Sequence, residues 1–149
     1  MMYVETRRIS GAAPQVLFDH LATAEAWAVW GHFPSSVLER PGTGTRYGVG
    51  AIRRIWPARE ETVVHEPPEH YAYRLLAGGP IRDYRADVRL EPRADGGTDL
   101  RWTARFEPRL PGTGAAARLA LRGLVGYLAA GLVRHCAACP PGCPAHNAT

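Results

Sequence analysis

Four side chains in the middle of the chain carry groups suited to moving protons around a carbonyl compound. They are Arg53, Glu61, His65 and Tyr84. An arginine inside a pocket can hold an enolate or carboxylate oxygen and stabilise charge that develops there, while a neighbouring carboxylate fixes its orientation. His65 suits a general acid or base because a histidine titrates at about pH 6.5. We therefore predict Arg53, His65 and Tyr84 as catalytic residues.

Each of these residues also has a structural explanation. Arg53 and Glu61 could form a cross-strand ion pair at the sheet surface, which is worth under ~1 kcal/mol. His65 precedes two prolines and could be a half-exposed residue at a strand end. Tyr73 and Tyr84 could donate hydrogen bonds to a carbonyl group or simply pack. The sequence leaves these alternatives open.

The elements that would position these residues form an antiparallel meander. A first strand is predicted over residues 3–10, and six more short strands follow, separated by turns rich in proline and glycine. Their predicted ranges are 36–41, 49–56, 59–66, 70–77, 82–92 and 97–107.

The register can be followed backwards from the last hairpin. A turn near Asp95 pairs Leu90 with Leu100 and Val88 with Trp102, apolar on apolar. Strict alternation then places Glu61 and His65 on the same inner face, as it does Tyr71, Tyr73 and Leu75. The hairpin at Pro57 would set Arg53 opposite Glu61, with Arg54 as the alternative if the register differs by one residue.

Helices are expected at both ends of the meander. Pro14 opens a short helix, and a second short helix carries Trp27 and Trp30 on one face. A long helix over residues 112–138 has apolar residues at steps of three and four. It also contains Gly123, Gly126 and Gly131, each costing about 1 kcal/mol relative to alanine. One interpretation is that another group approaches this helix closely, or that space is needed beside it. The alternative is that small residues simply fit a tight contact between the helix and the sheet.

The inner face of the sheet is apolar but carries several polar groups, which is typical of a ligand pocket. Besides the three catalytic candidates, the predicted pocket residues are Trp27, Trp30, Glu61, Tyr73, Trp102, Phe106, Leu124, Tyr127 and Leu128.

Composition limits the alternatives. The 149 residues suit one domain, and all 18 basic residues are arginine. The net charge of +4 does not favour nucleic-acid binding, because the arginines alternate with acids along the strands. We expect no signal peptide and no membrane span, and hence a cytoplasmic protein. We also expect no cofactor, and a homodimer is possible.

The C-terminal segment is unusual. Cys136, Cys139, Cys143 and His146 have spacings compatible with a zinc site, but the ligand pairs lie closer together than in a compact zinc knuckle. A flexible tail rich in cysteine and proline is the alternative. We favour a domain over residues 1–138 followed by such a tail over residues 139–149.

Several motifs resemble the START-like (SRPBCC) helix-grip superfamily, in its polyketide cyclase/dehydrase and lipid-transport branch. The resemblance covers about residues 3–135. The motifs are APQVLFDHL (13–21), GAIR (50–53), EPPEHYAYRL (66–75), GPIRDYR (79–85), GGTDLRW (96–102) and LPGTG (110–114).

This resemblance implies an α+β helix-grip fold, in which a curved seven-stranded antiparallel sheet wraps around the long C-terminal helix. Two short helices follow the first strand, and an internal cavity lies between sheet and helix. Trp27 and Trp30 would lie at the cavity mouth, and Tyr127 would project from the long helix.

Three functions remain open at this stage. The first is a cyclase or dehydratase acting on an apolar, oxygen-bearing molecule such as a polyketide. The second is a non-catalytic carrier or sensor of a lipid or quinone. The third is an interaction module that uses the outer face of the sheet.

Overall fold

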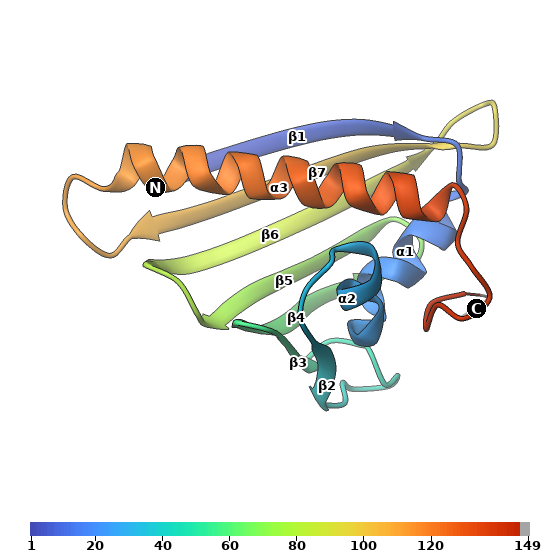
Figure 1. Cartoon of the computed structure of the whole chain (residues 1–149), viewed down its shortest axis with the longest axis horizontal. Helices are drawn as coiled ribbons and strands as arrows, with labels where there is room; N and C mark the ends of the chain where they lie inside the picture. The colour runs from blue at the N-terminus through green and yellow to red at the C-terminus, as the bar shows by residue number, and fades with distance from the viewer. Residues whose placement is uncertain (147–149) are drawn as a thin grey trace.

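In the computed structural model, which describes residues 1–146, a curved antiparallel sheet holds a long C-terminal helix (Figure 1). The strands are β1 (Met2–Ser10), β2 (Ser36–Arg40), β3 (Ile52–Ile55), β4 (Ala58–Glu66), β5 (His70–Ala77), β6 (Ile81–Pro92) and β7 (Thr98–Pro108). The helices are α1 (Pro14–Ala22), the 3-10 turn η1 (Ala24–Ala26), α2 (Trp27–Trp30) and α3 (Gly114–Cys136). The predicted helix-grip fold is confirmed.

The seven strands lie in the order β1-β7-β6-β5-β4-β3-β2. Successive strands from β2 to β7 are therefore neighbours, and β1 pairs with β7 to form one edge of the sheet. The predicted register of the last hairpin is confirmed, since Leu90 pairs with Leu100 and Val88 with Trp102. These four side chains are buried and form the floor of the core.

The predicted register of β4 is wrong in its first half. The hairpin turns at Trp56 and Pro57, so that Arg53 pairs with Glu60 and not with Glu61. An irregularity between Thr62 and Val64 then adds one residue to β4. Strict alternation counted through such a bulge assigns every earlier residue to the opposite face.

Helices α1 and α2 fill one end of the space between α3 and the sheet. The indole of Trp27 donates a hydrogen bond to the Leu21 carbonyl at 2.8 Å, and that of Trp30 to the His20 carbonyl at 3.0 Å. Both rings contact Trp102 of the sheet, at centroid distances of 6.0 and 6.4 Å. The two tryptophans thereby join the short helices to the centre of the core.

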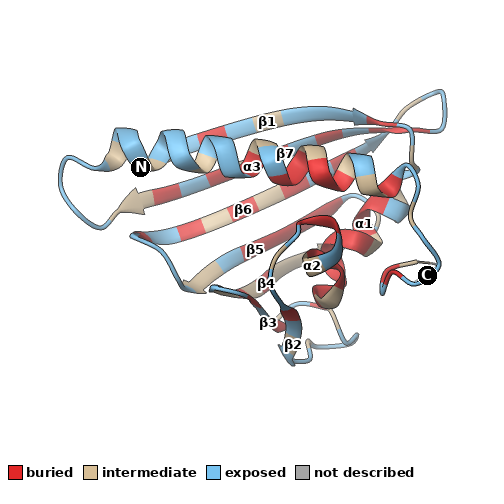
Figure 2. Cartoon of the chain, in the orientation of Figure 1, coloured by how far each residue is buried: buried red, intermediate tan, exposed pale blue. Residues whose placement is uncertain are grey.

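Helix α3 is buried over its C-terminal half and exposed over much of its N-terminal half (Figure 2). One of the three glycines has a packing role: a Cβ at Gly131 would meet the Trp30 carbonyl oxygen at 3.0 Å. A Cβ at Gly123 would meet no described atom within 4 Å. By length and composition α3 could cross a membrane, with mean hydropathy 1.4. In this fold it instead packs on β1 and β7 as the helix held by the sheet.

The described part of the predicted tail folds back onto the domain. Cys143 and Ala145 are buried and belong to the main hydrophobic core. Tight turns shape this segment, with the Cys143 amide bonded to the Pro140 carbonyl and the His146 amide to the Cys143 carbonyl, both at 3.0 Å. The remainder of the predicted tail, residues 147–149, lies outside the described residues.

Candidate ligand pocket

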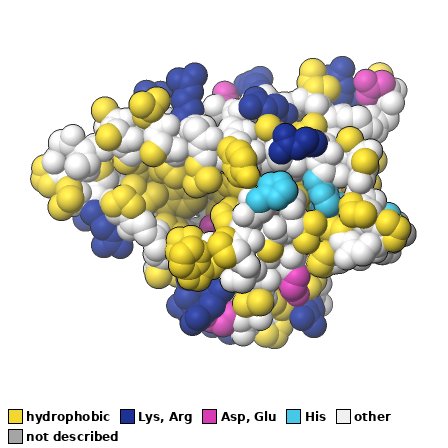
Figure 3. Space-filling view, in the orientation of Figure 1, with side chains coloured by type: hydrophobic (Ala, Val, Ile, Leu, Met, Phe, Trp, Pro, Cys, Tyr) yellow, Lys and Arg dark blue, Asp and Glu magenta, His cyan; other side chains and the backbone are white. Residues whose placement is uncertain are grey.

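A pocket of about 320 Å³ lies between the N-terminal half of α3 and the ends of strands β3 to β6. The space-filling view shows this region as a hollow with a largely hydrophobic surface (Figure 3). The sheet contributes Ile55, Ala58, Leu75 and Ile81, and α3 contributes Ala117, Ala120, Leu121, Leu124 and Leu128. Trp27 and Phe33 close the end nearest α2, and Pro57, Gly78, Gly79 and Pro80 form the rim.

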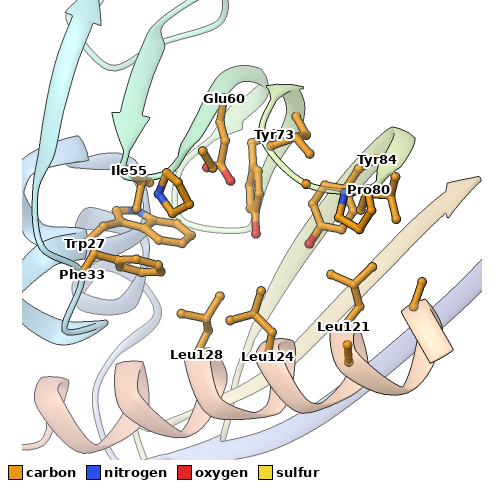
Figure 4. A pocket seen from close by; sticks show the side chains of 18 residues that line it. Trp27, Phe33, Ile55, Glu60, Tyr73, Pro80, Tyr84, Leu121, Leu124 and Leu128 are labelled. Carbon is orange, nitrogen blue, oxygen red and sulfur yellow. The ribbon is translucent and has the colours of Figure 1, made fainter. Parts of the chain in front are cut away.

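Three polar side chains reach this otherwise apolar pocket. They are Glu60 of β4, Tyr73 of β5 and Tyr84 of β6. In the close view their oxygen atoms point from the sheet toward the leucines of α3 (Figure 4). A few convergent polar groups within an apolar lining are what orients a mostly apolar ligand.

Arg53 binds the carboxyl of Glu60 from outside the pocket lining. Its Nε and Nη2 atoms donate hydrogen bonds to Glu60 Oε1 at 3.2 and 3.1 Å, and Nη1 donates to the Leu21 carbonyl at 2.9 Å. The guanidinium lies over the ring of Trp27, 4.2 Å from its centroid. Because both bonds to Glu60 end on Oε1, the second oxygen, Oε2, is the one a ligand can engage.

Burial dominates the ionisation of these groups. It raises the pKa of Glu60, although the charge and hydrogen bonds of Arg53 pull in the other direction. Burial likewise raises the pKa of Tyr73 and of Tyr84, so both phenols stay protonated hydrogen-bond donors near neutral pH. The pocket therefore holds a carboxyl with a raised pKa beside two protonated phenols.

Of the residues predicted for the pocket, five line it. Trp27, Tyr73, Leu124 and Leu128 do so, as does the catalytic candidate Tyr84. The lining also contains residues that the sequence analysis missed, notably Glu60, Phe33 and Leu121. Leu121 shares the three-to-four spacing of Leu124 and Leu128, which was a usable signal. Phe33 lies in a loop, where no periodicity indicates a direction.

The other predicted residues lie outside the lining. Trp30, Trp102 and Phe106 are completely buried core residues, and Tyr127 is half exposed on α3. Glu61 faces the outer side of the sheet, where it accepts a hydrogen bond from Arg74 at 2.7 Å and one from Arg40 at 3.3 Å. The expected pairing of Arg53 with Glu61 is thus replaced by the pair Arg53–Glu60.

His65 also lies away from the pocket. Its ring packs edge-on against Phe18 of α1, with the centroids 5.1 Å apart. Burial there lowers its pKa. Arg53, by contrast, is on the inner side as predicted, whereas Arg54 is on the outer side and bonds Glu39 at 2.7 Å.

Residues 1–137 match the protein family described as polyketide cyclase / dehydrase and lipid transport. The chain belongs to this family. No curated protein matches the sequence. The match to the family covers nearly the whole chain apart from its C-terminal segment, in agreement with the motifs between residues 13 and 114.

Several solved structures share the family's fold at low sequence identity. A START superfamily protein from Mycobacterium smegmatis superposes with a TM-score of 0.76 at 16% identity, covering 91% of this chain and 97% of that protein. Norcoclaurine synthase from Thalictrum flavum, solved with dopamine and hydroxybenzaldehyde, gives 0.68 at 11% identity, covering 89% and 84%. At these identities the likeness concerns the fold.

Proposed function

We propose that this protein binds a small, largely apolar molecule carrying carbonyl or hydroxyl oxygens in the pocket beneath α3. The observation that carries the proposal is the convergence of Glu60, Tyr73 and Tyr84 within an apolar lining of leucine, isoleucine and aromatic side chains. A sealed hydrophobic core does not place three such groups around an open space, since a buried polar group without a partner destabilises the fold.

The pocket volume sets the size of the ligand. At about 320 Å³ it is roughly twice the ~150 Å³ of an apolar cavity that takes up benzene. A molecule of two fused rings fits this space, and a longer chain would extend past the rim formed by Pro57 and Pro80. Aromatic or ring-forming polyketide-like compounds match this description.

The same groups support a proton-transfer reaction, namely cyclisation followed by dehydration. In this proposal Glu60 takes a proton from a carbon between two carbonyl groups, and Tyr73 and Tyr84 donate hydrogen bonds to the resulting enolate oxygen. The enolate carbon attacks a further carbonyl of the same molecule, and Glu60 returns its proton to the resulting alkoxide, which gives a ring alcohol. Glu60 then takes the remaining proton from the attacking carbon and delivers it to the hydroxyl, which leaves as water as the ring double bond forms.

Arg53 acts here as a positioning residue, because it contacts Glu60 and does not line the pocket. His65 was expected to be the acid or base, but the proposal gives that role to Glu60. Norcoclaurine synthase, which shares this fold, was solved in complex with hydroxybenzaldehyde, and this supports a carbonyl compound as the ligand of the proposed pocket.

The second candidate function is that of a carrier without chemistry. The family description names lipid transport beside the cyclases, and Arg53 already engages the one carboxyl of the lining. In a carrier, Glu60 and the tyrosines would only orient the ligand. The homodimer, the absence of nucleic-acid binding and the cytoplasmic location stay predictions.

Native mass spectrometry of the freshly purified protein tests the proposal. A bound molecule of a few hundred daltons, lost on denaturation, is expected for a carrier. For an enzyme, added naphthol should bind to the wild type, and to Leu119→Trp, but not to Leu124→Trp, which fills the pocket. Leu119 is exposed on the same helix and outside the lining, so it is a matched control. Equal binding to both variants would refute the assignment of the pocket.

A further inference from the structure

A second group of chemically competent side chains lies far from the pocket lining, where the C-terminal segment meets α1. It consists of His20 of α1, His135 in the last turn of α3, and Cys139 and Cys143 of the following segment. One nitrogen or sulfur atom of each residue lies within 4.8 Å of those of the other three. Segments from both ends of the chain meet at this point.

The spacing of these atoms is close to that of a tetrahedral metal site. His20 Nε2 lies 3.3 Å from Cys139 Sγ and 3.7 Å from Cys143 Sγ. With bonds of about 2.0 Å to nitrogen and about 2.3 Å to sulfur, two ligands of a tetrahedral zinc ion are about 3.6 Å apart. Small side-chain adjustments would bring all four atoms to bonding distance of one ion.

His20 is already oriented as a metal ligand. Its Nδ1 lies 2.8 Å from the Val16 carbonyl oxygen, and a carbonyl can only accept, so Nδ1 carries the proton. The lone pair is therefore on Nε2, which points at the two sulfur atoms. Metal-binding histidines are typically fixed in this way by a hydrogen bond from the other ring nitrogen.

His135 supplies a second, independent observation. Its Nε2 is buried and has no hydrogen-bond partner within residues 1–146. A buried polar atom in that state costs free energy unless something binds it. The rings of His20 and His135 lie edge to face with their centroids 5.0 Å apart, so the two histidines are direct neighbours.

We propose that His20, His135, Cys139 and Cys143 bind one zinc ion in a closed structural site that fastens residues 139–146 to α1 and α3. Binding releases one proton from each thiol, so that two thiolates balance the 2+ charge and two neutral imidazoles complete the tetrahedron. A site with no net charge suits its largely buried location. The ligand set differs from the one suggested by the sequence, since Cys136 and His146 do not belong to this group.

The loop between the cysteines favours the same assignment. Cys139 and Cys143 are separated by three residues, within the two to four typical of zinc-binding cysteine pairs. The turn closed by the Cys143 amide and the Pro140 carbonyl brings both thiols to the side that faces His20.

The test is the metal content and cobalt spectrum of the full chain, purified without a polyhistidine tag and kept reduced. One zinc per chain is expected. After zinc removal, cobalt(II) should give the visible bands of a tetrahedral site together with thiolate-to-cobalt charge transfer. Chelation should lower the unfolding temperature by about 5–10 °C if zinc is held at ~100 times its dissociation constant.

Variants decide which residues hold the metal. His135→Ala and Cys143→Ser should lose the cobalt spectrum and the stabilisation by zinc. Cys136→Ser and His146→Ala should keep both, because these neighbours lie outside the group. Circular dichroism checks that each variant folds, and Cys139→Ser, at a less buried position, replaces Cys143→Ser if the latter does not.

Three outcomes would overturn the proposal. The first is reduced protein that binds neither zinc nor cobalt. The second is an unchanged cobalt spectrum in His135→Ala. The third is an equal loss in Cys136→Ser, which would return the site to the C-terminal segment alone. Naphthol binding in the pocket is independent of all three.

Discussion

The buried pair Arg53–Glu60 gives the sharpest test of this structure, through the stability of the variant Arg53→Met. Methionine keeps much of the apolar stem but removes the three hydrogen bonds that Arg53 donates. Glu60 then remains as a carboxylate that is almost completely buried and has no cationic partner. Removing one partner of a buried ion pair costs about 3–5 kcal/mol in the free energy of unfolding.

The neighbouring residue provides a matched control. Arg54 is exposed and pairs with Glu39 on the outer side of the sheet, so Arg54→Met should cost no more than about 1 kcal/mol. The double variant Arg53→Met/Glu60→Gln should regain much of the loss, because it removes the unpaired charge. Urea denaturation at about pH 7 measures all four proteins; a domain stable by ~10 kcal/mol, the middle of the typical range, remains folded in each.

The pH dependence of this loss gives the reasoning a second check. Burial raises the pKa of Glu60 in the folded protein. At pH values between the pKa of Glu60 in the unfolded state and its higher pKa in the folded state, the folded protein therefore holds more protons than the unfolded protein. Stability is then full below the unfolded pKa and falls as the pH rises through the folded pKa. Without Arg53 the folded pKa is higher still, so Arg53→Met should recover stability between about pH 7 and pH 5, by up to ~1.4 kcal/mol per pH unit.

The difference between variant and wild type isolates Glu60, because the histidines titrate in both proteins. A loss below about 1 kcal/mol in Arg53→Met would refute the buried pair. A difference that stays constant with pH, or that Glu60→Gln fails to reduce, would show that the loss comes from packing over Trp27 and not from an unpaired carboxylate.

Three further predictions concern the pocket and the helix above it. Leu124→Trp should weaken naphthol binding at least about tenfold, as measured by calorimetry, because an indole occupies the volume that a ring would fill, whereas Leu119→Trp should bind like the wild type. Tyr84→Phe should weaken naphthol about two- to tenfold and leave naphthalene unchanged, which is the cost of one hydrogen bond; an equal effect on both ligands would contradict a role for the hydroxyl. Gly123→Ala should raise the free energy of unfolding by up to about 1 kcal/mol, since its Cβ meets open space, whereas Gly131→Ala should show a smaller gain or a loss because its Cβ meets a backbone carbonyl of α2 at 3.0 Å. Equal gains in thermal unfolding would refute that close contact.

Local sequence rules were sufficient where the sheet is regular. The hairpin at Asp95 alternates without interruption, so apolar pairing fixes its register from Leu90 to Leu100. Pro14 marks the first helix for an equally local reason, because proline fits the first helical turn. Most of the family motifs overlap regular elements of this kind.

The same rules placed Glu61 in the pocket, and the reason is the bulge near Val63. A bulge is one extra residue whose position depends on the curvature that the sheet needs to follow α3. The types of the neighbouring residues do not predict where it occurs. Counting without it exchanged Glu60 for Glu61 but left His65 on the inner face. Knowledge of the two-residue turn at Trp56 and Pro57 would have corrected the assignment from the other end.

The proposed zinc ligands could be predicted only in part, for a different reason. Cys139 and Cys143 are visible as a pair with His135 four residues before Cys139, but His20 becomes their neighbour only when α1 packs against the end of α3. A spacing rule applied to the C-terminal segment alone selects Cys136 and His146 as the nearest candidates. Tertiary packing, and not local spacing, makes His20 available as the fourth ligand.

The position of the pocket follows from how unequally the two halves of α3 are covered. Its C-terminal half lies under α1 and α2, whose Trp27 and Trp30 fill the space against Trp102. Its N-terminal half lines the pocket with the small side chains of Ala117 and Ala120, and no described helix covers it. At the end away from α2, two loops border the remaining space, at Pro57 and at Gly78 to Pro80.

These two loops meet because one of them contains a glycine at the point of contact. Gly78 has a φ of 108°, and a Cβ there would lie 2.9 Å from the Pro57 carbonyl oxygen. Any larger residue would separate the loops and widen the rim of the pocket. Since the short helices fill the other end, the proposed function requires a ligand to reach Glu60 and Tyr84 past this rim, so we expect the contact at Gly78 to set how open the entrance is.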